Sequence, residues 1–232
     1  MEPTWNRRSP RYEEEQAYQS LIEIHHITQL WLKAIEPNPN ATAYRLERFV
    51  PPNLVQNLWL LQKLKLDELP PELESVVDAN SVREFIEEME ETIWIVQSSV
   101  LENALQNTTD PIGLTNLLEQ VTWEQGKKVA ETRWPNFQSK DFFEALQDSP
   151  LWDKNAFLVE RKTDSQVSFY WMKSPIAKAS LKATPNVLIL CQLYHQWIRG
   201  FFFGLSKSIQ IEITPASLGG KKVWQINLLS SY

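Results

Sequence analysis

The chain has 232 residues, of which 43% are hydrophobic and 22% are charged, a composition typical of folded globular proteins rather than disordered ones. Its formal net charge of −6 does not favour a role in binding nucleic acid. The single cysteine, Cys191, excludes an internal disulfide and any zinc or iron–sulfur site built from several cysteines of one chain. Because the first residues show no secretory signal pattern, we expect a cytoplasmic protein.

The first half of the sequence is predicted to be helical. Residues 12–35 place apolar side chains at positions 17, 21, 24, 27 and 31, and the pattern stops where the prolines of "EPNPN" prevent a helix from continuing. A second helical stretch covers 53–66 and ends at "DELPPE". A third covers 80–101 and opens with a cap-like Asn80 or Ser81. The apolar stripe of this third helix consists of Val82, Phe85, Ile86, Met89, Ile93, Val96 and Val100.

Charge is unevenly spread along the chain. Residues 67–102 contain eleven acidic side chains against one basic, Arg83, whereas residues 181–232 contain five basic side chains against one acidic, Glu212. One interpretation is two solvated faces that complement each other within one fold. The other is an acidic docking surface for a protein partner with a basic surface. On that second interpretation the third helix supplies the contacts, through Glu87, Glu88 and Glu91.

The second half of the sequence predicts a different architecture. The turn-forming sequence "QNTTDPIG" at 106–113 marks a boundary. The expected elements after it are helices at 114–134 and 139–147, strands at 155–162 and 167–173, a helix at 187–205, and strands at 208–213 and 222–229 joined by "TPASLGG". We therefore expect an α-helical region over 1–106, followed over 112–232 by an α+β domain with an antiparallel four-stranded sheet packed by helices.

The helix at 187–205 is apolar enough to raise the question of a membrane span. Its polar residues argue against one, since a central arginine such as Arg199 costs about 2.5–3.5 kcal/mol on insertion. Gln192 and Gln196 are spaced by four residues, as are His195 and Arg199, so the four share one face. Two glycines four residues apart lie on another face and allow a second backbone to approach closely. We predict the central helix of the domain, buried nearly all round, with one polar stripe.

Features along this half of the chain follow an order that resembles a known family. A serine after a strand is followed by a helix that begins with cysteine and carries two glycines, a strand with a glutamate, a glycine turn and an alternating last strand. These features are Ser174, Cys191, Gly200, Gly204, Glu212, Gly219, Gly220 and Trp224–Leu228. The order resembles the vinyl-reductase-type small-molecule-binding domain, whose fold is shared by TRAPP transport-complex subunits and nitric-oxide-signalling regulators. Glu124 and Gly126 extend the resemblance to roughly residues 112–232.

The resemblance implies a dimer-forming domain with a hydrophobic pocket between helices and sheet. Such domains bind small apolar, aromatic or acyl ligands, or protein partners. Family members that resemble metal-binding or redox-active proteins carry further cysteines, where this chain has Pro215 and Trp224, so we expect neither a metal nor another cofactor. The candidate ligand-binding residues are Cys191, Trp197, Phe201, Trp171 and Tyr194.

Three functions remain open from the sequence. The first is a non-catalytic adaptor or scaffold that forms a homodimer and docks a partner through its acidic helix. The second is a sensor or carrier of a small apolar ligand. The third is an enzyme acting on a heterocycle or tetrapyrrole, which needs a polar cluster around Cys191, His195 and Glu212. No glycine-rich phosphate loop or Ser-His-Asp order is present, and we assign no catalytic residue. The adjacent His25 and His26 point in different directions on a helix, which does not favour a metal site.

Overall fold

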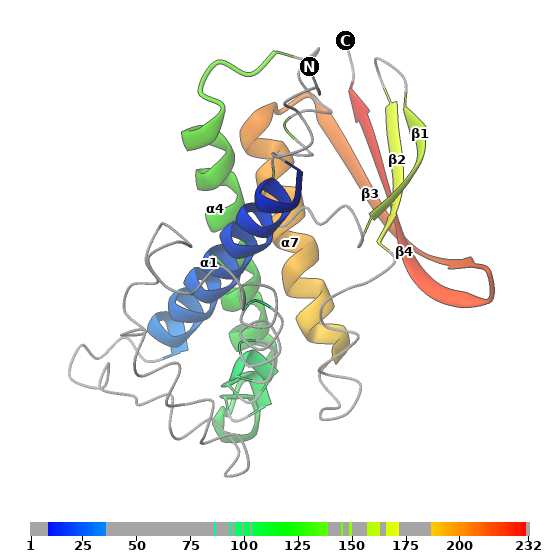
Figure 1. Cartoon of the computed structure of the whole chain (residues 1–232). Coiled ribbons are helices and arrows are strands. Elements are labelled where there is room, and N and C mark those ends of the chain that lie inside the picture. Colours follow the sequence, from blue (N-terminus) through cyan, green and yellow to red (C-terminus); the bar gives the residue numbers. More distant parts are fainter. Residues whose placement is uncertain are drawn as a thin grey trace, which may run out of the picture.

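A computed structural model describes residues 9–35, 86, 93, 96–98, 100–102, 104–138, 145, 149, 157–162, 166–171 and 187–230. Three helices and four strands have defined bounds: α1 (Ser9–Ile35), α4 (Pro111–Arg133), α7 (Val187–Leu205), β1 (Phe157–Lys162), β2 (Gln166–Trp171), β3 (Ile209–Leu218) and β4 (Lys221–Ser230). The strands form an antiparallel sheet in the order β1-β2-β4-β3 (Figure 1). This confirms the predicted mixture of an N-terminal helical region and a four-stranded antiparallel sheet.

The ends of the helices follow from local sequence chemistry. Helix α1 ends at Ile35, close to where the "EPNPN" prolines were expected to stop it. Helix α4 begins three residues before the predicted start because Pro111 fits its first turn and Asp110 caps it. The Asp110 carboxylate accepts a hydrogen bond of 2.9 Å from the backbone N–H of Gly113. Helix α7 covers the predicted range, 187–205.

The connection between the last two strands is tighter than the sequence indicated. The stretch "TPASL" was expected to be a loop, but β3 continues through it to Leu218 and pairs with β4 along its whole length. The turn consists of Gly219 and Gly220, whose φ angles of +56° and +78° are readily adopted by glycine. Pro215 is tolerated because β3 lies at the edge of the sheet, where a missing N–H need not break the ladder.

Helices α4 and α7 lie side by side and run in the same direction (Figure 1). Glycines allow their backbones to touch, as the sequence predicted for the helix at 187–205. A Cβ atom on Gly200 would lie 1.9 Å from the carbonyl oxygen of Trp123, and one on Gly126 would lie 2.2 Å from that of Trp197. Neither position can therefore carry a side chain unless the helices move apart.

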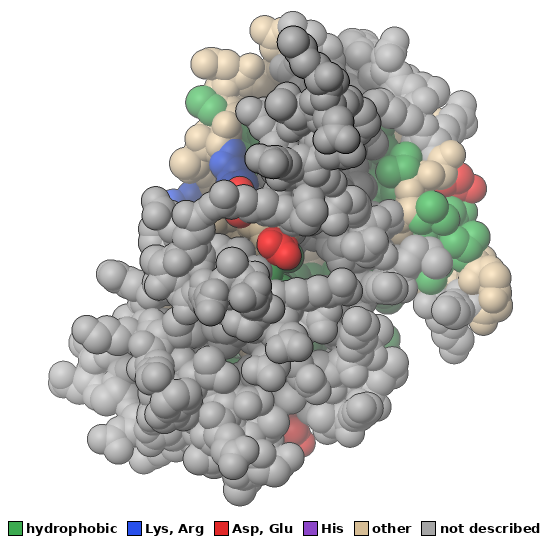
Figure 2. Space-filling view, in the orientation of Figure 1, with side chains coloured by type: hydrophobic (Ala, Val, Ile, Leu, Met, Phe, Trp, Pro, Cys, Tyr) green, Lys and Arg blue, Asp and Glu red, His purple; other side chains and the backbone are tan. Residues whose placement is uncertain are grey.

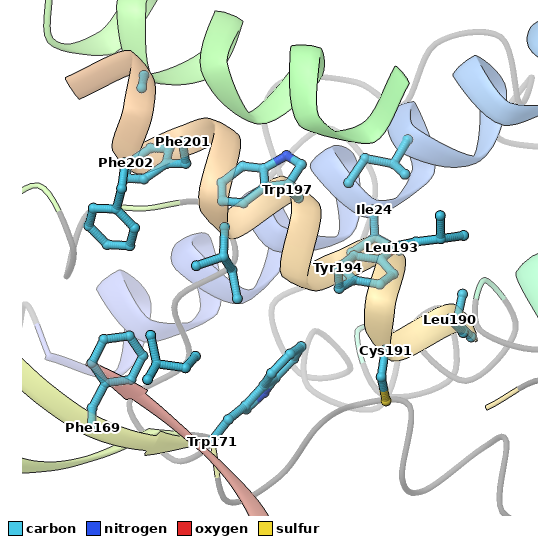
Figure 3. Packing of buried hydrophobic residues seen from close by; sticks show 14 of the residues in the cluster. Ile24, Phe169, Trp171, Leu190, Cys191, Leu193, Tyr194, Trp197, Phe201 and Phe202 are labelled. Carbon is cyan, nitrogen blue, oxygen red and sulfur yellow. The ribbon is translucent and has the colours of Figure 1, made fainter. Parts of the chain in front are cut away.

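Helix α7 is the centre of the core. Tyr194 and Trp197 are each 1% exposed and Leu193 is fully buried. The predicted polar stripe is exposed only at Gln192, because Gln196 and Arg199 are partly buried and His195 is buried. Phe169 and Trp171 of β2 rise from the sheet toward one side of α7, while α1 and α4 cover the other side (Figure 3). Within the described residues, no helix combines the length and hydrophobicity needed to cross a membrane.

Two predicted helices, 53–66 and most of 139–147, lie outside the described residues, as do Glu87, Glu88 and Glu91 of the acidic helix. From the predicted stripe of that helix, the structure describes Ile86, Ile93, Val96 and Val100, all of them helical and buried.

Candidate functional site

The five residues expected to bind a ligand lie on two different sides of α7. Tyr194, Trp197 and Phe201 face α1 and α4, whereas Cys191 faces the sheet, from which Trp171 projects (Figure 3). The structure therefore brings Cys191 and Trp171 to one side and separates them from the other three.

On the helical side, Trp197 contacts a buried carboxylate that the sequence analysis did not single out. The indole Nε1 of Trp197 donates a hydrogen bond of 2.8 Å to Glu23 of α1, and the side-chain amide of Gln125 donates another of 3.1 Å. Glu23 is 8% exposed. Burial raises the pKa of Glu23, and the two hydrogen bonds and the charge of Arg133 oppose that effect without cancelling it.

Tyr194 belongs to a second buried polar network on the same side. Its hydroxyl donates a hydrogen bond of 2.9 Å to the side-chain oxygen of Gln97. The amide nitrogen of Gln97 donates to the Thr28 hydroxyl at 2.8 Å and to the Ile24 carbonyl at 3.1 Å. Burial raises the pKa of Tyr194 well above its ordinary value, so the hydroxyl remains a donor at neutral pH. Gln97 is fully buried, and this network connects α1, α7 and the segment around residue 97.

Aromatic contacts fill the rest of this side. Phe201 stacks on Trp197 with ring centroids 5.2 Å apart, and meets Trp134 edge-on at 5.7 Å. Trp31 of α1 meets Tyr194 edge-on at 6.2 Å, and its Nε1 donates to the Thr122 hydroxyl at 2.7 Å. These contacts give Tyr194, Trp197 and Phe201 a role in packing α1, α4 and α7 together.

On the sheet side, the imidazole of His195 lies between two tryptophans. Its ring centroid is 6.0 Å from that of Trp171 and 4.5 Å from that of Trp224. Cys191 lies one helical turn earlier on the same face and is 6% exposed. Burial, with a smaller effect from the Arg199 charge, lowers the pKa of His195 to about 4, so the ring is neutral at neutral pH. Within the part of the chain that the structure describes, His195 Nε2 has no hydrogen-bond partner.

The polar cluster required by the enzyme hypothesis does not form around these residues. Cys191 and His195 share a face of α7, but Glu212 is exposed on β3. Its neighbours Ile211 and Ile213 pack against the core, so the Glu212 side chain points away from His195. On α1, a ring nitrogen of His25 lies 3.0 Å from the Gln29 amide, while His26 is exposed. Among the described residues, no group of three potential metal ligands exists.

Sequence reasoning missed Glu23, Gln97 and Gln125. A signal for Glu23 was present, because it precedes Ile27 by four residues and Trp31 by eight and so falls on the apolar face of α1. Gln97 directly follows a residue of the predicted stripe, and Gln125 directly precedes Gly126. No sequence pattern pairs these three residues with Trp197 or Tyr194.

Comparisons with protein-family models, curated proteins and solved structures found no match to this chain.

Proposed function

We propose that the chain is a non-catalytic cytoplasmic scaffold that associates with a second copy of itself. The main support for this proposal is that two large aliphatic side chains are exposed to solvent where α4 and α7 begin. Ile112 is 75% exposed and Leu188 is 72% exposed. Exposed apolar groups that lie together mark interaction surfaces, whereas isolated ones carry no such meaning.

The two side chains lie along the same seam. Glu119 of α4 accepts hydrogen bonds from Gln192 and Gln196 of α7. These three residues therefore mark the seam along which the two helices meet. Ile112 precedes Glu119 by two turns on one face of α4, and Leu188 precedes Gln192 by one turn on one face of α7. We refer to Ile112 and Leu188 as the seam pair. The resemblance to a dimer-forming family supports a second copy of the chain as the occupant of this surface.

The oligomeric state tests this proposal. We expect wild-type protein to sediment as a dimer, and the double variant Ile112→Asp/Leu188→Asp to be a monomer. Aspartate is tolerated in the first turn of a helix, so both positions should still fold. Burying each aliphatic side chain contributes about 1.5–3 kcal/mol, so the dissociation constant should rise by roughly a hundredfold or more. A monomeric wild type, or a double variant as dimeric as wild type, would contradict the proposal.

Leu158 supplies a matched control. It is 48% exposed on β1, and hydrophobic side chains are visible at the surface over the sheet in Figure 2. Leu158 pairs with Tyr170 in the sheet. Its strand, β1, is an edge strand and lies away from the first turns of α4 and α7 (Figure 1). The variant Leu158→Ser should remain a dimer. If it were a monomer, the dimer interface would lie on the sheet instead.

We further propose that the scaffold binds a protein partner with a basic surface through the acidic residues Glu87, Glu88 and Glu91. Such a contact is electrostatic, so its affinity should fall steeply as salt is raised, and neutralising the three carboxylates as glutamines should remove that salt dependence. Affinity that does not depend on salt would contradict this contact.

His195 favours a second candidate, binding of a small apolar or aromatic ligand between α7 and the sheet. A buried ring nitrogen without a hydrogen-bond partner among the described residues would gain one from a ligand. Trp171 and Cys191 lie on the same side and offer it apolar contact. Native mass spectrometry of the purified protein tests this candidate. A non-covalent added mass that is lost in the variant His195→Phe would support it, and a protein without added mass would argue for the scaffold alone.

A further inference from the structure

One buried carboxylate of helix α1 is bonded to both α4 and α7. Glu23 accepts hydrogen bonds from Gln125 of α4 and Trp197 of α7, which are 102 and 174 residues away in the sequence. We refer to Glu23, Gln125 and Trp197 as the Glu23 latch. Glu23 lies among the apolar residues of α1 that enter the core, such as Ile24 and Ile27. Both donors of the latch are neutral, and a carboxylate that is 8% exposed loses most of its hydration when α1 docks.

We propose that the Glu23 latch makes the docking of α1 depend on pH. When the Glu23 carboxyl binds a proton, α1 lies firmly on α4 and α7. When the carboxyl is ionised, α1 detaches more often, because water solvates the charge better than two neutral donors do. Detachment uncovers the side of α7 that carries Tyr194 and Trp197. This device does not depend on the seam pair or on self-association.

The direction of the effect follows from linkage. Burial raises the pKa of Glu23 in the docked state above that of an exposed carboxyl. The stabilisation from protonation is therefore fully present below the pKa of an exposed glutamate, and it is lost as the pH rises through the pKa of docked Glu23. For each pH unit by which the docked pKa exceeds the exposed one, the opening constant of α1 rises about tenfold.

Titratable and charged groups of the neighbouring helices also act on the latch. From α4, the Arg133 charge favours ionised Glu23 but does not outweigh burial. From α7, the pKa of Tyr194 is raised far above the neutral range, so Tyr194 does not titrate there. On α1, His26 hydrogen-bonds Gln125, and partial desolvation of its ring together with the Lys128 and Lys33 charges lowers its pKa. A histidine with a lowered pKa loses stabilisation as the pH falls, which is the opposite sense to Glu23.

Hydrogen–deuterium exchange of the full chain tests the proposal. The protection of α1 amides would be measured from about pH 4, below the pKa of an exposed glutamate, up to pH 8, and corrected for the intrinsic pH dependence of exchange. In wild type we expect protection to fall as the pH rises. In Glu23→Gln the fall should disappear, because the amide keeps an acceptor for Trp197 and does not titrate. Glu15→Gln, at an exposed carboxyl of the same helix, should behave as wild type.

Two outcomes overturn the proposal: α1 protection in wild type that does not change with pH, or the same pH dependence in wild type and Glu23→Gln. A carbon-13 NMR titration of the Glu23 carboxyl in wild type gives a second measurement that needs no variant. A pKa at or below that of an exposed glutamate would overturn the proposal even if Glu23→Gln failed to fold. The variant His26→Gln should retain the fall in protection, and its loss there would assign the effect to His26.

Discussion

The Nε1 atom of Trp197 donates a hydrogen bond of 2.8 Å to the carboxylate of Glu23, which lies 174 residues earlier in the chain. The bond joins the first helix to the central helix of the α+β domain. Around it, Trp31, Leu21 and Ile24 of α1 belong to the same core cluster as Leu193 and Phe201 of α7. Helix α1 is therefore packed into the core of the domain.

Removing the donor of this bond should destabilise the protein. Trp197→Phe keeps an aromatic ring in the core but leaves the buried carboxylate with the Gln125 bond and without the indole bond. Hydrogen bonds to charged groups contribute about 1.5–3 kcal/mol, and the smaller ring adds a packing loss. We expect the free energy of unfolding, measured by urea denaturation, to fall by at least about 2 kcal/mol.

Trp123→Phe is the matched control, because Trp123 is half-buried on α4 and pairs with the Phe203 ring at 5.1 Å, a contact that phenylalanine can largely retain. Its effect should be well below that of Trp197→Phe. If the free energy of unfolding fell equally in the two variants, the hydrogen bond to Glu23 would contribute nothing to stability and ring packing would account for the whole loss.

The elements of the fold were largely predictable from the sequence because their signals are local. The periodicity of apolar residues located α1 and α7, and the prolines of "EPNPN" located the end of α1. Alternation located the two hairpins. The length of β3 was predicted wrongly because the composition of "TPASL" is typical of a loop. The strand conformation of this stretch depends on its pairing with β4 across the glycine turn.

The candidate site was less predictable, because it depends on which side of α7 each residue faces. The sequence placed Tyr194, Trp197, Phe201 and Cys191 on a buried helix, which the structure confirms. Helical spacing separates Cys191 from Trp197, but no sequence signal indicated that the sheet lies beside Cys191 and α1 beside Trp197. The contacts of Glu23 and Gln97 join residues far apart in the sequence, and periodicity carries no information on such pairs.

Gly200→Ala should destabilise the protein although alanine is the better helix former. Helix propensity alone would stabilise the helix by about 1 kcal/mol. A Cβ atom at this position would instead lie 1.9 Å from the Trp123 carbonyl oxygen, and the backbone of α4 can move away only by breaking its packing. Overpacking typically costs about 1–3 kcal/mol or more, so thermal unfolding should occur at a lower temperature. Gln120→Ala, at an exposed position of α4, should leave the unfolding temperature nearly unchanged. A Gly200→Ala variant that unfolds at a higher temperature than wild type would refute the close contact between the two helices.

Tyr194 and Gln97 should be energetically coupled. Tyr194→Phe leaves the buried Gln97 oxygen without its Tyr194 donor, so the free energy of unfolding should fall by about 1–3 kcal/mol. Gln97→Leu should lower the free energy of unfolding in wild type, because the Tyr194 hydroxyl loses the Gln97 oxygen as its acceptor and the Thr28 hydroxyl loses the Gln97 amide as a donor. The loss should be smaller once Tyr194 is phenylalanine. A double-mutant cycle by urea denaturation should give a coupling energy of about 0.5–3 kcal/mol. Additive losses would show that the two side chains act independently.

His195 should make the stability of the protein depend on acid pH. Its pKa in the folded protein is about 4, below that of an exposed histidine, because burial and the Arg199 charge disfavour the imidazolium. A histidine with a depressed pKa contributes stabilisation that is present above about pH 6.5 and is lost as the pH falls toward the folded value. The loss should be on the order of 3 kcal/mol between those limits.

The measurement is the free energy of unfolding of wild type and His195→Phe between pH 7 and pH 4. Phenylalanine keeps an aromatic ring beside Trp224 but cannot bind a proton, so the difference between the two proteins should change over this range by the amount that His195 contributes. The carboxyls that titrate in both proteins cancel in that difference. Proton NMR of the imidazole gives the pKa directly, and a value near that of an exposed histidine would mean that water reaches the ring between Trp171 and Trp224.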